Sequence, residues 1–322
     1  MAYWKERTGI AITQLLIWLQ LSTGKYYAWK KRRKLGPTAG GMPRGSDRVI
    51  PKAHWLLPWE VEAIVEYRLQ HPTEGYRRLA YMMLDADVVA VSPSSVYRVL
   101  KKRGLLLSRW RHTRAKGSGF IQPTRPHEHW HLDISYINYK GTFVYLMALI
   151  DGYSRLVVHF AVKLSIEALD VEIFIEEARE KFPSENPILI TDNGPQFIAK
   201  EFKTYLQIVG ITHRRTRFFY PQSNGKVERF IQTCKNESVR KQSFIDLEDL
   251  IEQIAAYIEY YNTQRLHSAL GYITPLDMLE GRQQEIIQVR KQKLLKAQEM
   301  RKNRHRESAY SVASSGVGDK HT

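Results

Sequence analysis

The sequence has one cysteine, no long apolar run and fewer acidic than basic residues. Because Cys234 is the single cysteine among 322 residues, a disulfide framework and a cysteine-based zinc site are both excluded. No apolar stretch reaches the roughly 18 residues that a membrane span requires. Met1 to Arg7 carry charges, and the apolar run of a signal peptide does not follow them. These absences predict a soluble cytoplasmic protein with no membrane partner.

The shortage of acidic residues gives the chain a strong positive charge. It has 33 Asp and Glu against 49 Lys and Arg, for a formal net charge of +16. A polyanion is the favoured partner, because neutralising phosphates releases their condensed counterions. A merely solvated basic surface is the alternative. With 43% hydrophobic residues the chain can bury a core, and its length predicts two or three domains.

Three acidic residues stand in distinctive local contexts. Asp133 lies in a stretch where apolar and polar residues alternate, so it is expected mid-strand on the more polar face. Asp192 follows the short apolar segment 187–191 and precedes Asn-Gly. Glu228 is expected in the first turns of a helix, thirty-five residues after Asp192. If the fold brings them together, the three carboxylates would be hard oxygen ligands for a divalent metal. Three solvated surface charges are the alternative.

These contexts resemble the DDE catalytic core of the retroviral-integrase superfamily, and above all the transposases of bacterial insertion sequences. The resemblance covers roughly residues 124 to 281. It includes a second signature in the segment 261–275, whose Asn262, Arg265 and His267 are expected to be structural hydrogen-bonding residues. The His-His-Cys-Cys zinc module of retroviral integrases is absent from this chain.

The resemblance implies metal-dependent DNA cleavage and strand transfer at the ends of a mobile element. Asp133, Asp192 and Glu228 would be both the catalytic residues and the metal ligands. Asp133 would bridge two Mg²⁺ ions, and Asp192 and Glu228 would each complete one site. Mg²⁺ suits carboxylate ligands, and Mn²⁺ is expected to substitute. No other cofactor is expected.

The resemblance also implies DNA contacts beside these carboxylates. Lys235 lies seven residues after Glu228, so both fall on one helix face, where relatives carry a basic residue that contacts the element end. The loop 218–225, with Gln222 and Asn224, would touch DNA near the cleaved bond. An ordinary surface lysine is the alternative for Lys235.

Three features close to the acidic residues need separate interpretation. Asn193 and Gly194 are expected to form a tight turn, since both tolerate positive φ. His131 stands where relatives carry a small polar residue. A structural role is favoured for it over metal or water positioning. Residues 217–220 depart from the Arg-Pro that relatives often have, which puts the loop conformation in doubt but not the acidic residues.

Two helical units are expected before the core. Helices at 10–21 and 25–33 predict a helix-turn-helix whose basic second helix, with Lys25 and Lys30, contacts DNA. An amphipathic hairpin is the alternative. Helices at 59–69, 75–85 and 94–103 predict a second such unit. Its outward face carries the residues expected to bind DNA, which are Arg98, Lys101 and Lys102. The basic segment 101–116 is interpreted as a linker along the DNA backbone, with a disordered arm as the alternative.

The core is expected to be a ribonuclease H-like α/β (α+β) domain. Its predicted elements are strands at 130–136, 142–150 and 155–162, a helix at 166–181, a strand at 187–191, a helix at 196–209, a strand at 211–215 and a helix at 225–240. Pattern alone gives only α/β or α+β, and the topology comes from the resemblance. The expected domains are 1–50, 51–123, the core at 124–242, a helical C-terminal segment at 243–306 and a disordered tail at 307–322.

The chain is therefore interpreted as a transposase that acts on element ends and target DNA and is nucleoid-associated when bound. Strand joining needs two ends held together, so a homo-oligomer on DNA is expected. A separate upstream DNA-binding protein stays open as a further partner. Two other functions also stay open: a nuclease that cuts without joining, and a regulator that binds DNA without turnover.

Overall fold

The computed structural model describes residues 6–19, 21–34, 55–107, 122–216 and 224–315. The chain divides into two compact units, Leu56–Met300 and a second unit that combines Met1–Trp55 with Arg301–Thr322. In the second unit, α2 spans Ile12–Trp18 and α3 spans Thr23–Lys34. The helix expected at 10–21 is shorter than predicted, and no side chain caps its first turn. The segment 35–51, which follows α3, lies entirely outside the described residues.

A three-helix bundle opens the larger unit. It consists of α4 (Pro58–Gln70), α5 (Tyr76–Asp85) and α6 (Pro93–Lys102), close to the predicted positions. Ile64, Leu79 and Leu100 are buried where the three helices meet. Ser92 caps α6, because its hydroxyl accepts the N–H of Ser95 at 3.3 Å. Ser95 itself is buried, 7% exposed, beneath this cap.

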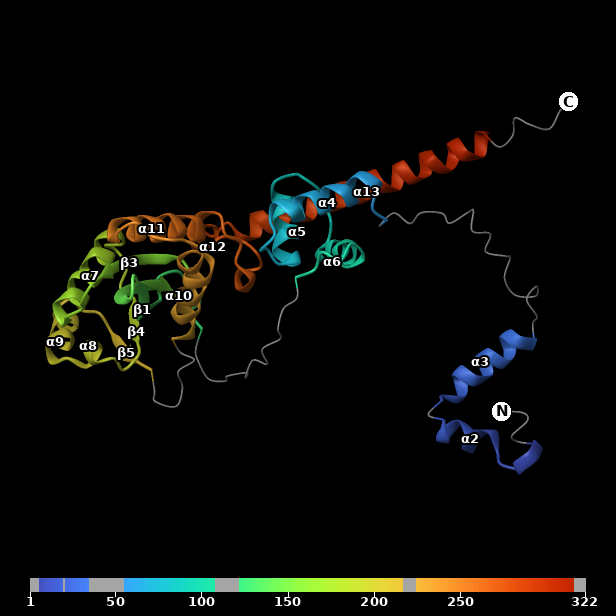
Figure 1. The fold of residues 1–322 in the computed structure, drawn as a ribbon, viewed down its shortest axis with the longest axis horizontal. Helices are drawn as coiled ribbons and strands as arrows, with labels where there is room; N and C mark the ends of the chain where they lie inside the picture. Colours follow the sequence, from blue (N-terminus) through green and yellow to red (C-terminus); the bar gives the residue numbers. More distant parts are fainter. Residues whose placement is uncertain (1–5, 20, 35–54, 108–121, 217–223, 316–322) are drawn as a thin grey trace. The chain divides into compact units, whose positions relative to one another are not determined.

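The core contains one five-stranded sheet in the order β3-β2-β1-β4-β5. Figure 1 labels β3, β1, β4 and β5 in this sheet. Its strands are β1 (His129–Tyr139), β2 (Thr142–Asp151), β3 (Val157–Lys163), β4 (Ile188–Thr191) and β5 (His213–Arg215). The first three strands form an antiparallel meander, and β4 and β5 join beside β1 in parallel. This is the predicted ribonuclease H-like α/β arrangement.

Alternation along β2 divides the core between two faces of the sheet. Val144 and Leu146 face a cluster formed with α10 (Gly225–Glu237) and α11 (Leu247–Thr263). Met147 and Leu149 face a second cluster on the opposite side. The helices of that side are α7 (Ala168–Lys181), α8 (Pro195–Ile198) and α9 (Lys200–Ile208). The single helix predicted at 196–209 is therefore two helices, which meet at Ala199.

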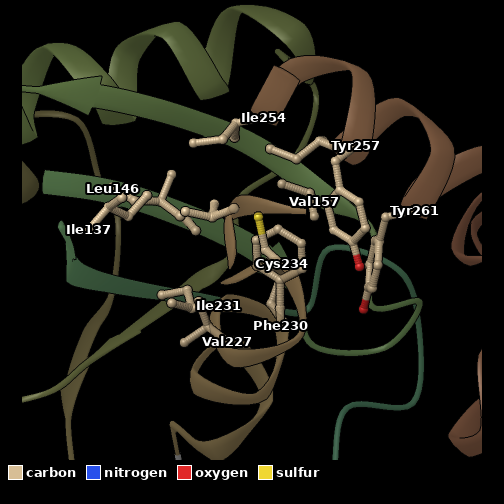
Figure 2. Close-up of a cluster of buried hydrophobic side chains, with 14 of the residues drawn as sticks. Ile137, Leu146, Val157, Val227, Phe230, Ile231, Cys234, Ile254, Tyr257 and Tyr261 are labelled. Carbon is tan, nitrogen blue, oxygen red and sulfur yellow. The ribbon is translucent and has the colours of Figure 1, made fainter. Parts of the chain in front are cut away.

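The first cluster continues past residue 242, where the core was predicted to end. Figure 2 shows Ile254, Tyr257 and Tyr261 of α11 packed with residues of α10 and the sheet. Cys234 is buried among them, as expected of a small helical residue. Burial raises the pKa of the Cys234 thiol to about 12, so it is not a reactive thiolate. Helix α11 is thus an integral part of the core.

The segment after α11 contains short elements that link it to the bundle. They are η3 (Ser268–Leu270) and α12 (Pro275–Leu279), the latter unpredicted although Thr274 and Asp277 form a capping box. The long helix α13 (Gln283–Ser315) follows. Arg290 of α13 donates to both carboxylate oxygens of Asp85 at 2.8 and 2.6 Å. None of the described helices has a stretch long and apolar enough to span a membrane.

Candidate active site

Asp133 is placed by the alternation of β1, a central strand of the sheet. Trp130 and Leu132 point into the cluster formed with α7 and α9. Asp133 and Ser135 therefore point to the opposite face, where α10 lies. The sequence predicted this polar face, and the structure shows that α10 covers it.

Asp192 directly follows β4, in a loop fixed at two points. The backbone N–H of Gly194 donates to Asp192 Oδ1 at 2.9 Å, which orients the carboxylate. The side chain of Asn193 donates to the carbonyl oxygen of Thr216, beyond β5, at 2.8 Å. The expected positive φ is wrong for both Asn193 and Gly194. A Cβ at Gly194 would lie 3.1 Å from Asp192 Oδ1, so a side chain at this position would push against the carboxylate.

Glu228 lies in the first turn of α10, as predicted, and its side chain is exposed. The residue before the helix is Asn224, whose amide donates to the carbonyl oxygen of Leu132 at 3.0 Å. This bond joins the start of α10 to β1 one residue before Asp133. The position of Glu228 relative to Asp133 is therefore fixed by a contact across 92 residues of sequence.

The electrostatics show that the three carboxylates share one region. Burial raises the pKa of Asp133 most, the charges of Asp192 and then Glu228 also raise it, and the resulting pKa is about 7. The pKa of Glu228 is also raised, by burial and then by Asp192. The N–H of Ile134 and the charge of Lys235 oppose the shift at Asp133. The site thus has excess negative charge, which a cation would stabilise.

The carboxylates are close but not gathered into a ready-made coordination sphere. Among the described residues, no group of three or more His, Cys, Asp and Glu side chains is arranged to hold a metal ion. Their chemistry still suits a hard divalent cation, since all three provide only oxygen ligands. Asp192 and Glu228 are both exposed, so their side chains have room to rotate towards an ion.

Two predicted site residues are structural in this arrangement. Asn224, expected to contact DNA, is 1% exposed and turned inward, so its side chain is not available to DNA here. The reason is its bond to Leu132, which compensates the burial of both polar groups. His131 is fully buried, and burial holds its pKa well below the usual value. A neutral, packed imidazole agrees with the structural role favoured for His131.

Lys235 lies beside the carboxylates, on the same face of α10 as Glu228. Its ammonium donates to the Ser135 hydroxyl at 2.7 Å. Burial lowers the pKa of Lys235, and the charge of Asp133 opposes that change. Sequence reasoning missed Ser135, although the alternation of β1 places it on the face of Asp133. The predicted DNA contact of Lys235 stays a prediction.

The other predicted DNA contacts lie in the helical units. Lys25 and Lys30 are exposed on α3. Lys101 and Lys102 are exposed at the end of α6, where the Lys101 ammonium lies 6.0 Å from the centre of the Tyr97 ring. Arg98, also exposed, donates to the Ser95 hydroxyl at 3.1 Å. Gln222 and the segment 217–220 lie outside the described residues.

Two family models described as integrase core domain match the chain, at residues 123–221 and 209–275. The transposase for insertion sequence element IS904 of Lactococcus lactis is 29% identical over 180 residues, or 52% of this chain and 71% of the relative. The putative transposase InsK for element IS150 of Escherichia coli is 27% identical over 217 residues, or 63% of this chain and 76% of the relative.

Solved structures of integrases are also similar to the chain. The catalytic core of HTLV-2 integrase in complex with magnesium is 20% identical, with a TM-score of 0.40, over 48% of this chain and 97% of that chain. A simian T-cell lymphotropic virus intasome is 17% identical, with a TM-score of 0.45, over 67% of this chain and 74% of that chain.

The sheet order and the two family matches define an integrase core, the fold of a DDE-type polynucleotidyl transferase. The chain belongs to the DDE transposases of the retroviral-integrase superfamily.

Proposed function

We propose that this transposase cleaves a DNA strand at the end of a mobile element and joins the freed 3′-hydroxyl to another phosphodiester. Asp133, Asp192 and Glu228 are the residues that hold the required divalent ions. The observation that carries the proposal is the placement of three carboxylates on β1, just after β4 and in the first turn of α10, within electrostatic reach of one another. Concentrated charge of this kind destabilises a fold unless a ligand compensates it.

The need for metal follows from the substrate. A phosphodiester is negatively charged and resists nucleophilic attack. Divalent ions held by these carboxylates would activate the attacking oxygen and stabilise charge on the phosphorus and the leaving oxygen. Mg²⁺ fits this donor set, since it prefers carboxylates and water and lets substrate phosphate fill the remaining positions.

Each carboxylate has a part that follows from its position. Asp133 lies on β1, the central strand of the sheet, and would be a ligand of the bound ions. Asp192 is oriented by the N–H of Gly194. Glu228 extends from a helix whose start is bound to β1 through Asn224. The side chain of Lys235, on the same face, would hold a DNA phosphate next to the reacting bond.

The partners of the site are DNA segments and other copies of the chain. The exposed basic residues of α3 and α6 would hold the element ends, with phosphate contacts that position DNA. Joining requires two ends in one assembly, so a homo-oligomer on DNA follows from the reaction. A separate upstream DNA-binding protein is compatible with this scheme and is not required by it.

The decisive experiment uses DNA that carries the flanking segments of the gene. The full chain and its Glu228→Gln variant are incubated with this DNA and Mg²⁺, and the products are resolved on a denaturing gel. Nicked and joined strands are expected from the wild type alone. Glu201→Gln, which makes the same change at an exposed residue of α9, should retain both products.

The alternative outcomes are distinct. Nicks without joined strands would contradict strand transfer and indicate a nuclease. DNA binding without any metal-dependent product would indicate a regulator. Joined strands from Glu228→Gln would contradict the role given to Glu228.

A further inference from the structure

A second charged site lies beside the core, away from the three carboxylates. It is a cavity of about 270 Å³ between α10 and the segment that follows α11. We call it the cationic pocket. Its charged lining residues are Arg78, Arg155, Lys226, Arg229 and Arg265. No Asp or Glu of the described residues lines it. Burial, and then the charge of Arg155, lower the pKa of Lys226 to about 7, so the four arginines carry most of the positive charge, and this charge favours an anion.

Helical geometry separates this pocket from the carboxylate site. Lys226, Arg229 and Thr233 are three or four residues apart on α10 and so share one face, which lines the pocket. Glu228 and Lys235 are seven residues apart and share a different face. Because successive residues turn by about 100°, the two faces point in clearly different directions. The pocket is therefore not an extension of the candidate active site.

Two of the four arginines already have carboxylate partners, and the side chain of Lys226 donates to the carbonyl oxygen of Gly152 at 2.8 Å. Arg265 donates to both oxygens of Glu237 at 2.7 Å, which fixes its guanidinium in the wall. Arg78 forms an ion pair with Glu74 at 2.6 Å. The floor is aromatic, with the rings of Phe230 and Tyr261 4.9 Å apart (Figure 2). These contacts hold the side chains that form the walls and floor of the pocket in fixed positions.

Arg155 and Arg229 differ from those two arginines. No carboxylate of the described residues forms an ion pair with either side chain. Arg155 is largely buried, and its Nη1 atom lacks a hydrogen-bond partner within the described structure. The nearest acid, Asp151, is occupied by the N–H of His127 and by both donors of Ser154. Arg155 thus lines the pocket while one donor of its guanidinium has no partner within the fold, and buried donors are rarely left unsatisfied.

The pKa of His267 reflects the excess of positive charge in the pocket. His267 lines the same cavity, and its pKa falls to about 4, first because of burial and then because of the neighbouring arginines. A neutral imidazole remains there at physiological pH. The backbone of Arg155 adopts a φ of 67°, in the left-handed region that is unfavourable for residues other than glycine. The turn after β2 holds this conformation while its side chain lines the pocket.

We propose that the cationic pocket binds one phosphate group of the DNA backbone, at a point separate from the bond that is cut. Guanidinium groups match phosphate in shape and bind it through paired N–H donors. The volume suits a single phosphodiester and not a duplex, so the strand would cross the pocket mouth. Arg229 and Ser268 are exposed at that mouth, where a strand can reach them. The choice of DNA as the source of the phosphate rests on the proposed function.

The first test measures the binding of inorganic phosphate to the full-length chain. Phosphorus NMR is recorded in EDTA with the Glu228→Gln variant, so that neither metal nor turnover contributes. Saturable binding is expected, weakened about tenfold or more when Arg229→Gln or Arg155→Gln is added, because a charge-assisted hydrogen bond is lost. Arg229 is exposed, so its variant should fold even if Arg155→Gln does not. Lys203→Gln, on the opposite face of the sheet, is the matched control and should bind as before.

The second test distinguishes DNA phosphate from a small anion. Binding of the flanking DNA is followed by fluorescence anisotropy at several salt concentrations in EDTA. A plot of log K against log[salt] has a negative slope. Loss of one phosphate contact in Arg229→Gln should make this slope shallower by about 0.9, whereas the slope of Lys203→Gln should stay unchanged.

Phosphate binding that is unchanged in both arginine variants would overturn the proposal. Weakened phosphate binding with an unchanged salt slope would overturn its DNA part and leave a small-anion site. Neither test uses strand cleavage, so a chain that passes both but yields no cleavage products would lose only the proposed function.

Discussion

The ammonium group of Lys235 donates a hydrogen bond to the hydroxyl of Ser135 at 2.7 Å. This contact joins the helix that carries Glu228 to the strand that carries Asp133, two residues from the carboxylate. Together with the bond from Asn224 to Leu132, it fixes α10 against β1 at two points about three turns of helix apart. The two anchors hold a cluster of like charges in place without metal.

Metal affinity should depend on pH through the ionisation of Asp133. Its pKa is raised to about 7, so below pH 7 its carboxyl is mostly protonated and is a poor ligand. We expect the affinity for Mg²⁺ to rise between pH 6 and pH 8 and then level off. Calorimetry in buffers of different ionisation enthalpy should show proton release on binding at pH 6.5. In Asp133→Asn the release should disappear. An affinity that is constant from pH 6 to pH 8 would contradict this assignment.

Removing the charge of Lys235 should move that pH dependence upward. Lys235 lowers the pKa of Asp133, so in Lys235→Gln the carboxyl should hold its proton to a higher pH. The midpoint of the affinity profile for Mg²⁺ should then shift up by a few tenths of a pH unit or more. The matched control is Lys241→Gln, which removes an exposed charge from the turn after α10 and should leave the midpoint in place. Equal midpoints in all three proteins would show that Lys235 does not act on Asp133.

The metal-free protein should gain stability when Asp133 is replaced by Asn. The pKa of Asp133 is about 7 in the folded protein and 3.8 in the unfolded chain. Its contribution to stability is therefore fully present below pH 3.8 and is lost as the pH rises through about 7. At pH 8 the ionised side chain therefore destabilises the fold, by an amount on the order of 2 kcal/mol after allowance for solvent. Urea unfolding in EDTA should show Asp133→Asn more stable than wild type at pH 8. The difference should shrink towards pH 4, and a variant that is less stable at pH 8 would refute the electrostatic account.

The order of elements and the polar face of β1 could be predicted from sequence because both depend on local periodicity. The contexts of Asp192 and Glu228 are local as well. The inward position of Asn224 could not be predicted, since its partner Leu132 is 92 residues away. The apolar stripe of α11 was visible in the sequence, but its packing with Cys234 and Val157 joins segments that only the fold brings together.

Some features that were not predicted had nevertheless left a signal in the sequence. Thr274-Pro275 followed by Asp277 is a helix start, and it precedes α12 directly. The cationic pocket, in contrast, left almost no signal in the sequence. Arg155, Arg229 and Arg265 come from three separate parts of the chain. In the sequence, each of them looks like an ordinary surface arginine. Only their convergence distinguishes them.

Gly152 supports the buried side of the site, and replacing it should destabilise the core. A Cβ at this position would lie 2.8 Å from Nε2 of His131 and 3.1 Å from the carbonyl oxygen of His129. His131 is fully buried and cannot move aside, and the His129 contact is to backbone. Gly152→Ala should therefore lower the free energy of unfolding by about 1–3 kcal/mol, the usual cost of overpacking.

Gly225→Ala is the matched control for this prediction. Nothing lies within 4 Å of a Cβ at Gly225, and alanine is a better helix former at the start of α10. We expect it to leave the unfolding free energy unchanged or slightly raised in the same urea titration. Gly152→Ala also disturbs the position of His131 on the strand of Asp133, so its strand-transfer rate should fall even at temperatures where it is fully folded. Wild-type stability in Gly152→Ala would show that β1 and the turn after β2 can separate, and that the support of Asp133 from this side is weaker than the contacts indicate.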